Sequence, residues 1–270
     1  MNSRYKGIFF ITLSALSFAF MNAFVRLSGD LPSVQKSFFR NLVAFFIALI
    51  MIIRSKDGFK IEKGNLKYMI LRATFGTVGI LCNFYAVDHL VLSDASMLNK
   101  MSPFFVIIFS FLLLKEKMSP AQALAVAGAF IGSLFVIKPT FTNMALVPSL
   151  IGLCGGICAG IAYAMVRILG QRGQKGSSVV IFFSGFSCVV PLPYLLLDFH
   201  PMSGLQILTL LGAGLAAAGG QFGITAAYYH APAKEISIYD YSQIIFSTIL
   251  GFFLFGQVPD RYSVLGYVII

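Results

Sequence analysis

Three ionisable residues, Arg40, Lys100 and Asp240, lie inside apolar stretches long enough to cross a membrane. A charge inside a bilayer is costly, so each is a candidate for binding a polar ligand. Arg40 could hold a carboxylate or a phosphate through two parallel hydrogen bonds. Alternatively, it could extend with Lys36 to the lipid headgroups. The same two alternatives, a cavity wall and a headgroup contact, apply to Lys100.

Asp240 is the only carboxylate that falls clearly inside a predicted membrane span. It could bind the ammonium group of a substrate, pair with Lys100 or Arg40, or take up a coupling proton. Because a predicted loop lies nearby, it could instead be a residue of the membrane interface. These alternatives stay open at the level of sequence.

Uncharged polar residues lie beside these charges or in the middle of other apolar stretches. Buried polar groups in lipid need hydrogen-bond partners, so contacts between helices explain each one singly, and together they would form a polar lining. The residues predicted to bind substrate, besides the three ionisable ones, are Asn22, Asn83, Asn99, Tyr163, Gln221 and Tyr239. We interpret Arg26, Arg72 and Arg167, which lie nearer the ends of their stretches, as anchors at the membrane surface.

The elements that must position these residues are membrane-spanning helices. Of the 270 residues, 58% are hydrophobic and 11% are charged, whereas soluble domains carry about 25% charged residues. Pro103 is predicted to kink its span, and Pro191 and Pro193 to distort theirs. Spans are predicted at 7–27, 35–53, 66–87, 95–114, 120–137, 148–168, 178–197, 205–228, 235–255 and from 261 onward, the tenth being incomplete. We interpret the first as a span and not as a secretory signal.

The basic residues predict the orientation of these spans. The formal net charge is +10, but lysine and arginine lie between apolar blocks, so we reject nucleic-acid binding. They concentrate at the N-terminus and in alternate loops, which predicts a cytoplasmic N-terminus in a multi-pass protein of the cytoplasmic membrane. The basic loops are 54–65, 115–119, 169–177 and 229–234.

The chain also repeats itself. Residues 84–118 reappear in outline as residues 225–259, so that His89 aligns with His230, 141 positions later. Five spans in each half would insert the two halves with opposite orientations. Inverted repeats of this kind are typical of transporters that open a central site to each side in turn.

The repeated block has specific features: Pro-Phe-Phe at 103–105, Lys-Glu-Lys at 115–117 and Gly-Ala-Phe-Ile-Gly at 128–132. In these features the chain resembles the EamA family of the drug/metabolite transporter superfamily, over essentially its whole length. The resemblance implies an all-α integral membrane protein of ten helices in two inverted five-helix repeats, residues 1–140 and 141–270. It also implies both ends in the cytoplasm, a central cavity between the halves, and no use of ATP.

We therefore expect a secondary active transporter of a small polar organic metabolite. A cationic contact (Arg40 or Lys100) and an anionic one (Asp240) would suit a zwitterion, which favours an amino acid or an amino-acid derivative. The alternatives are a non-transporting membrane partner or sensor subunit, and a transporter of nucleotide-linked or quaternary amine compounds. A proton or an ion could couple to transport, and the protein could be a monomer or a homodimer.

Enzymatic chemistry is not expected. The chain has no P-loop, no His-Glu-x-x-His and no Gly-x-Ser-x-Gly motif. Its four cysteines lie in apolar blocks with no histidine or aspartate at ligand spacing, which predicts no metal site and no cofactor.

Overall fold

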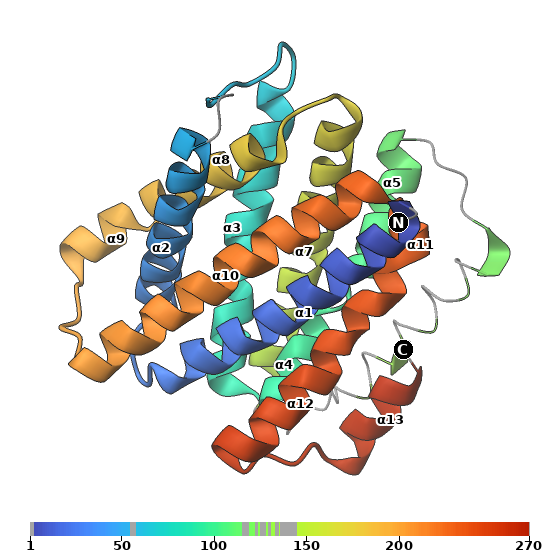
Figure 1. The fold of residues 1–270 in the computed structure, drawn as a ribbon. Coiled ribbons are helices and arrows are strands. Elements are labelled where there is room, and N and C mark those ends of the chain that lie inside the picture. The colour runs from blue at the N-terminus through green and yellow to red at the C-terminus, as the bar shows by residue number, and fades with distance from the viewer. Residues whose placement is uncertain are drawn as a thin grey trace.

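The computed structural model describes residues 3–54, 58–114 and 145–269, together with isolated positions between 119 and 135. Over this part of the chain the protein is helical and has no strand (Figure 1). The predicted all-α membrane fold is confirmed. The predicted span 120–137 lies outside the described residues except at those isolated positions.

The helices follow the apolar stretches of the sequence closely. In the first half they are α1 (Ser3–Leu27), α2 (Ser33–Arg54), α3 (Leu66–His89), α4 (Leu92–Asn99) and α5 (Ser102–Leu114). In the second half they are α7 (Leu146–Gln171), α8 (Gly176–Val189), α9 (Leu192–Leu197), α10 (Gly204–His230), α11 (Ala233–Ile236), the 3₁₀ helix η1 (Ser237–Tyr241), α12 (Ser242–Phe255) and α13 (Arg261–Ile269).

Among the described residues, 7 helical segments are long and apolar enough to cross a membrane. Two of them, Leu92–Leu113 and Gly176–Leu197, join a pair of shorter helices. The total of ten spans stays a prediction, because 120–137 is not described as a whole and α13 has only 9 residues.

Two spans are interrupted at equivalent places in the two halves. The first half breaks between Asn99, the last residue of α4, and Ser102, the first of α5. Pro103, which has no N–H and clashes with a preceding helical turn, follows this break directly. In the second half, η1 replaces α-helix over Ser237–Tyr241. The prediction of one continuous helix over 235–255 is therefore wrong.

Small residues let the helices approach closely. A Cβ atom at Gly156 would lie 2.4 Å from the carbonyl oxygen of Leu98, and one at Gly160 would lie 2.4 Å from the Cβ of Phe105. The glycine run of α7 therefore packs inside the subunit, against the interrupted helix of the other half.

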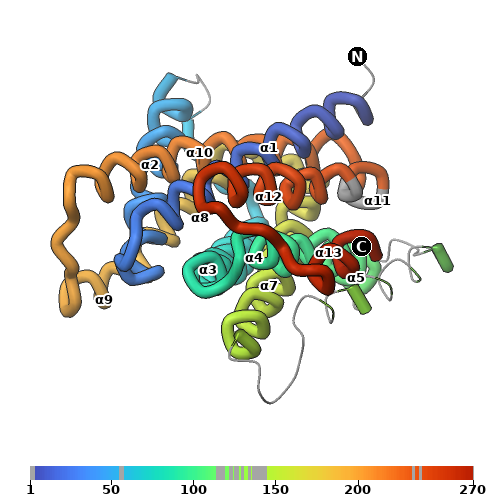
Figure 2. Tube along the Cα trace, turned by 90° about the horizontal axis from the view of Figure 1, so that it is seen from below, coloured from blue at the N-terminus to red at the C-terminus, as the bar shows by residue number. Residues whose placement is uncertain are grey.

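The two halves are interleaved across the centre of the molecule. Helix α1 lies side by side with α10, and α3 packs on α7 (Figure 1, Figure 2). Helix α12 also packs on α1 and α4. Large apolar side chains such as Ile53, Leu197 and Phe253 are exposed on the outside of this bundle, as expected of surface that faces lipid. The polar residues described next lie between the helices.

Candidate functional site

A cavity lies at the centre, between helices of the two halves. Six of the nine predicted binding residues line it: Asn22, Arg40, Asn83, Asn99, Tyr163 and Gln221. Further lining residues include Met21, Arg72, Phe183 and Gln243. Its volume is about 50 Å³, room for a few water molecules, so a metabolite could enter only if the surrounding helices moved apart.

Arg40, on α2, is completely buried at 0% exposure. Its Nε lies 3.3 Å from the sulfur of Met21, and its Nη1 donates to the side-chain oxygen of Asn41. Its Nη2 has no hydrogen-bond partner. No carboxylate of the described residues pairs with it. Arg40 therefore does not extend to the lipid headgroups, and its charge is directed into the cavity wall.

Arg72, on α3, lies in the same wall, and its interpretation as a surface anchor is wrong. It is 2% exposed, its Nη2 donates to Oε1 of Gln221 over 2.7 Å, and its guanidinium lies 3.9 Å from the ring centre of Phe183. A Cβ atom at Gly76 would lie 2.1 Å from Nη1 of Arg72. In the sequence, Gly76 follows Arg72 by one helical turn, and this spacing indicates that the arginine side chain could lie against the helix and not extend to the surface.

Lys100 and Asp240 form a buried ion pair where the two interrupted spans meet. Lys100 Nζ lies 2.7 Å from Asp240 Oδ2, and the two side chains are 2% and 0% exposed. Among the alternatives that the sequence left open for Asp240, the structure shows the ion pair with Lys100. The other carboxylate oxygen, Oδ1, has no hydrogen-bond partner. Asn99 and Gln243, close in sequence to these two residues, line the cavity.

The uncharged polar residues divide into two groups. Asn83 donates to Asn22 over 3.0 Å, which leaves Asn22 Nδ2 and Asn83 Oδ1 without partners beside the cavity. Tyr163 lies 5.8 Å from Tyr228, ring centre to ring centre. Tyr239, by contrast, is 39% exposed and lies in a surface groove with Ile245 and Ile249. The structure does not bring Tyr239 to the cavity.

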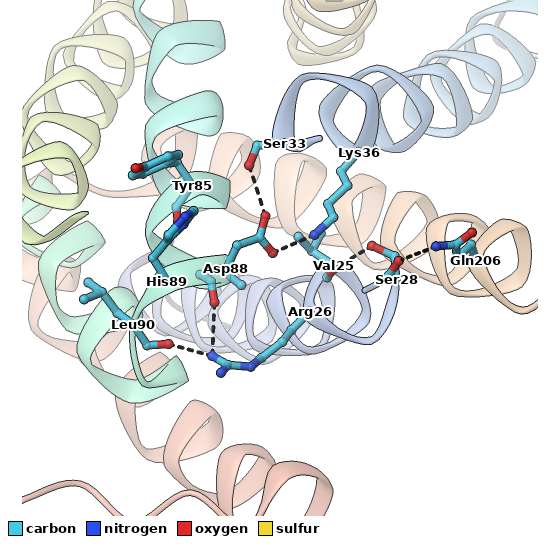
Figure 3. Close-up of polar contacts among 11 residues, drawn as sticks. Val25, Arg26, Ser28, Ser33, Lys36, Tyr85, Asp88, His89, Leu90 and Gln206 are labelled. Atoms are coloured by element: carbon cyan, nitrogen blue, oxygen red, sulfur yellow. Dashed lines mark hydrogen bonds and ion pairs between the residues drawn. The ribbon is translucent and has the colours of Figure 1, made fainter. Parts of the chain in front are cut away.

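A polar cluster joins α1, α2 and α3 at one end of the bundle (Figure 3). Lys36 Nζ lies 2.6 Å from Asp88 Oδ1, and the hydroxyl of Ser33 donates to Asp88 Oδ2 over 3.0 Å. Arg26 donates to the carbonyl oxygens of Val87 and Leu90 over 3.1 and 2.6 Å. We call Arg26, Ser33, Lys36 and Asp88 the Asp88 cluster.

The Asp88 cluster lies about one helical turn from the cavity on each of its helices. Asn22 precedes Arg26 by one turn on α1, and Arg40 follows Lys36 by one turn on α2. Arg26 also lies 5.4 Å from the ring centre of Phe255 at the end of α12. The cluster thus connects the end of α1 to the second half, and Arg26, half-buried in the last turn of α1, lies near the end of its span as predicted.

The opposite end of the bundle is held by a second set of hydrogen bonds. Arg172 Nε donates to the side-chain oxygen of Asn65 over 2.6 Å, and Asn65 Nδ2 donates to Gln174 Oε1 over 3.3 Å. The hydroxyl of Tyr229 donates to the carbonyl oxygen of Gln174 over 2.7 Å. Polar contacts therefore link the helices at both ends of the bundle.

This arrangement of interrupted helices around a buried polar cavity agrees with the family comparison. The sequence model described as the EamA-like transporter family matches residues 5–138 and 150–270. The chain belongs to the EamA-like transporter family. The predicted resemblance is thereby confirmed, and the protein is a multi-pass membrane transporter of a small molecule.

Three relatives illustrate the family's range. CntI, a pseudopaline exporter of Pseudomonas aeruginosa (strain UCBPP-PA14), is 30% identical over 267 residues, covering 98% of this chain and 93% of the exporter. Solute carrier family 35 member G1 of Homo sapiens is 30% identical over 274 residues, covering 96% of this chain and 75% of that protein. A riboflavin transporter of Brucella anthropi is 27% identical over 242 residues, covering 85% and 82%.

A solved crystal structure supports the fold alone. It has a TM-score of 0.71 at 15% sequence identity, covering 99% of this chain and 93% of the other. The names of the relatives describe transport and not catalysis, in line with the prediction that this EamA protein is not an enzyme.

Proposed function

We propose that this EamA protein is a secondary active transporter that carries an amino acid or an amino-acid derivative across the cytoplasmic membrane by alternating access. The observation that carries the proposal is the polar cavity at the centre, beside the two interrupted spans. Transporters of several folds bind substrate where discontinuous helices meet near the middle of the membrane. The relative named as a pseudopaline exporter supports an organic metabolite as cargo.

In this mechanism the two ends of the bundle open in turn. With the N-terminus in the cytoplasm, as the basic loops predict, the Asp88 cluster lies toward the outside and the contacts of Asn65, Arg172 and Gln174 lie toward the inside. Release of one set would admit substrate to the cavity while the other set stays closed. Either the substrate gradient or a coupled proton or ion would drive the cycle.

Recognition would rest on the groups that already point into the cavity. Arg40 and Arg72 would hold a carboxylate, and the side-chain oxygens of Asn83 and Gln243, which have no partner, would accept from substrate N–H or O–H groups. Lys100 contacts one oxygen of the Asp240 carboxylate and neutralises its charge, and Asp240 is not among the residues that line the cavity, so we assign recognition to the groups of the cavity wall.

Uptake into proteoliposomes tests the proposal. Purified protein is reconstituted and exchange is measured with a panel of radiolabelled amino acids, their derivatives and quaternary amines. Ala162, which lines the cavity and is 1% exposed, is replaced by leucine to fill it. Leu215, 62% exposed on α10, is replaced by phenylalanine as the matched control on the lipid-facing surface.

We expect exchange of at least one panel member, abolished in Ala162→Leu and retained in Leu215→Phe. Both variants must elute as the wild type does on size exclusion. Equal exchange by Ala162→Leu and the wild type would refute the site. A folded wild type that exchanges nothing in the panel would refute the proposed function and favour a non-transporting partner or sensor. If only quaternary amines are exchanged, the substrate class is a quaternary amine and not an amino acid.

A further inference from the structure

We infer that the cavity binds its substrate as an anion with two acidic groups, one held by Arg40 and the other by Arg72. The inference rests on the proposed function, transport of a small polar metabolite through this cavity, and changes the charge class of that metabolite. It replaces a zwitterion by a dicarboxylate or an acidic amino-acid derivative. It follows from the charges and the unused hydrogen-bonding groups of the cavity wall.

The charges of the wall do not balance. Arg40 and Arg72 line the cavity, and none of the described residues that line it is an aspartate or a glutamate. The nearby Lys100 and Asp240 neutralise each other over 2.7 Å. Two positive charges therefore lie in the protein interior without an acidic partner in the described part of the chain. Burying an ion without a counter-charge is strongly unfavourable, so an anionic ligand would supply what the wall lacks.

The cavity wall has unused acceptors, the side-chain oxygens of Asn83 and Gln243, and three unused donors, and the donors suit the same anionic ligand. Arg40 Nη2, Arg72 Nε and Asn22 Nδ2 are buried donors without partners. The protein already fixes the remaining part of each arginine, since Asn41 accepts from Arg40 and Gln221 accepts from Arg72. Phe183, 3.9 Å from the guanidinium, holds the plane of Arg72. Positioned guanidinium donors are the preferred partners of carboxylates.

A zwitterion fits this wall less well. Its single carboxylate would satisfy one arginine, and its ammonium would enter a wall with no free carboxylate among the described residues. The second arginine would then repel the ammonium. A ligand with a second carboxylate in place of the ammonium has neither the unpaired ammonium nor its repulsion by the second arginine, because each arginine acquires a counter-charge.

The first experiment uses the wild-type protein only and compares ligands that differ by one charge. Binding of succinate and of succinamate, and of L-glutamate and of L-glutamine, is measured by concentration-dependent thermal stabilisation in detergent. Ionic strength is held constant, because salt screens charge interactions. We expect the diacid of each pair to bind at least about tenfold more tightly than its amide, the value of one charge-assisted hydrogen bond. Equal or tighter binding of the amides would overturn the inference, as would binding of neither member of either pair.

The second experiment assigns the two acidic groups to the two arginines. Arg40→Gln and Arg72→Gln should each weaken succinate binding at least about tenfold and reduce the difference between succinate and succinamate. Arg54→Gln, the same change at an exposed position of α2, is the control and should bind as the wild type does. If Arg72→Gln does not fold, Arg72→Lys replaces it in the test, because lysine keeps the charge but lacks the paired guanidinium donors. Unchanged preference for succinate in the folded arginine variants would overturn the assignment.

The exchange assay separates failure of this inference from failure of the proposed function. If a neutral or zwitterionic metabolite is exchanged and Arg40→Gln does not affect that exchange, the proposed transport function stands and the inference of a dianionic substrate is wrong. Absence of exchange for every metabolite, with the protein folded, would remove the proposed function itself.

Discussion

The ion pair between Lys100 and Asp240 makes a quantitative prediction about stability. Lys100→Met removes the ammonium and Asp240→Asn removes the carboxylate charge at nearly constant volume. Each single variant leaves the other charge buried in the helix bundle, with side-chain exposure of 2% or less. Breaking a buried pair in this way costs about 3–5 kcal/mol, whereas removing both partners is far less costly because no lone charge remains.

The double-mutant cycle measures this difference. We expect each single variant to lose about 3–5 kcal/mol, on the order of 10 °C in apparent melting temperature. We expect the double variant, Lys100→Met with Asp240→Asn, to be more stable than either single variant and to lose much less free energy of unfolding relative to the wild type. The chain has no tryptophan, so unfolding is followed by the helical circular dichroism signal in detergent. Lys60→Met breaks a pair with Glu62 whose side chains are 67% and 42% exposed, and as the control it should change stability by less than about 1 kcal/mol.

Two results would refute this reasoning. Additive costs in the double variant would mean that the two charges do not stabilise each other. A Lys100→Met variant as stable as Lys60→Met would mean that the pair is not buried in the folded protein. The pair joins the two interrupted spans next to the cavity residues Asn99 and Gln243. Asp240→Asn and Lys100→Ala should therefore also abolish exchange while the protein stays folded. Normal exchange by both would show that transport does not depend on the pair.

Three further predictions concern packing, opening and capping. Gly156→Ala should destabilise the fold by about 1–3 kcal/mol in thermal melts, because the added methyl group meets the backbone of the interrupted span; Gly204→Ala, which meets no atom within 4 Å, should be close to neutral. Asp88→Asn should leave Lys36 buried without its counter-charge and favour opening of that end. In a cysteine-free background, a maleimide should then label a cysteine at Ile80 in the cavity wall faster, and an unchanged rate would contradict the role of the cluster. Ser203→Ala removes the hydrogen bond from the Gln206 backbone N–H to the Ser203 hydroxyl in the capping box that begins α10, and leaves the bond from the residue 203 backbone N–H to Gln206 Oε1. It should cost about 1 kcal/mol in the same melts, and no change would be the contrary result.

The long helices could be predicted from the sequence because membrane spans are defined by continuous apolar runs. Spans predicted at 35–53 and 148–168 correspond to α2 (Ser33–Arg54) and α7 (Leu146–Gln171). The break beside Pro103 could be anticipated because proline cannot continue the hydrogen-bond ladder. The 3₁₀ segment Ser237–Tyr241 could not, because Ile244 stands at the equivalent position and no local residue forbids an α-helix there.

The partners inside the site could not be predicted because they depend on tertiary distance. Lys100 and Asp240 are 140 residues apart in sequence, and several pairings were equally consistent with the pattern. Arg72 was assigned to the membrane surface from its position in the span. Its burial depends on Gly76 and Phe183, which come together only in the folded bundle. Tyr239 is the neighbour of Asp240, yet the local geometry of η1 directs it to the surface.

The division of charges between the halves has a consequence for biosynthesis. Arg40, Arg72 and Lys100 are synthesised and inserted with the first half, whereas Gln221 and Asp240, the partners of Arg72 and Lys100, emerge only with α10 and η1. Until then the nascent chain holds cations within the membrane without these partners. The first half expressed alone should consequently insert less stably into the membrane and be degraded by membrane proteases. Co-expression of the second half as a separate polypeptide should rescue it.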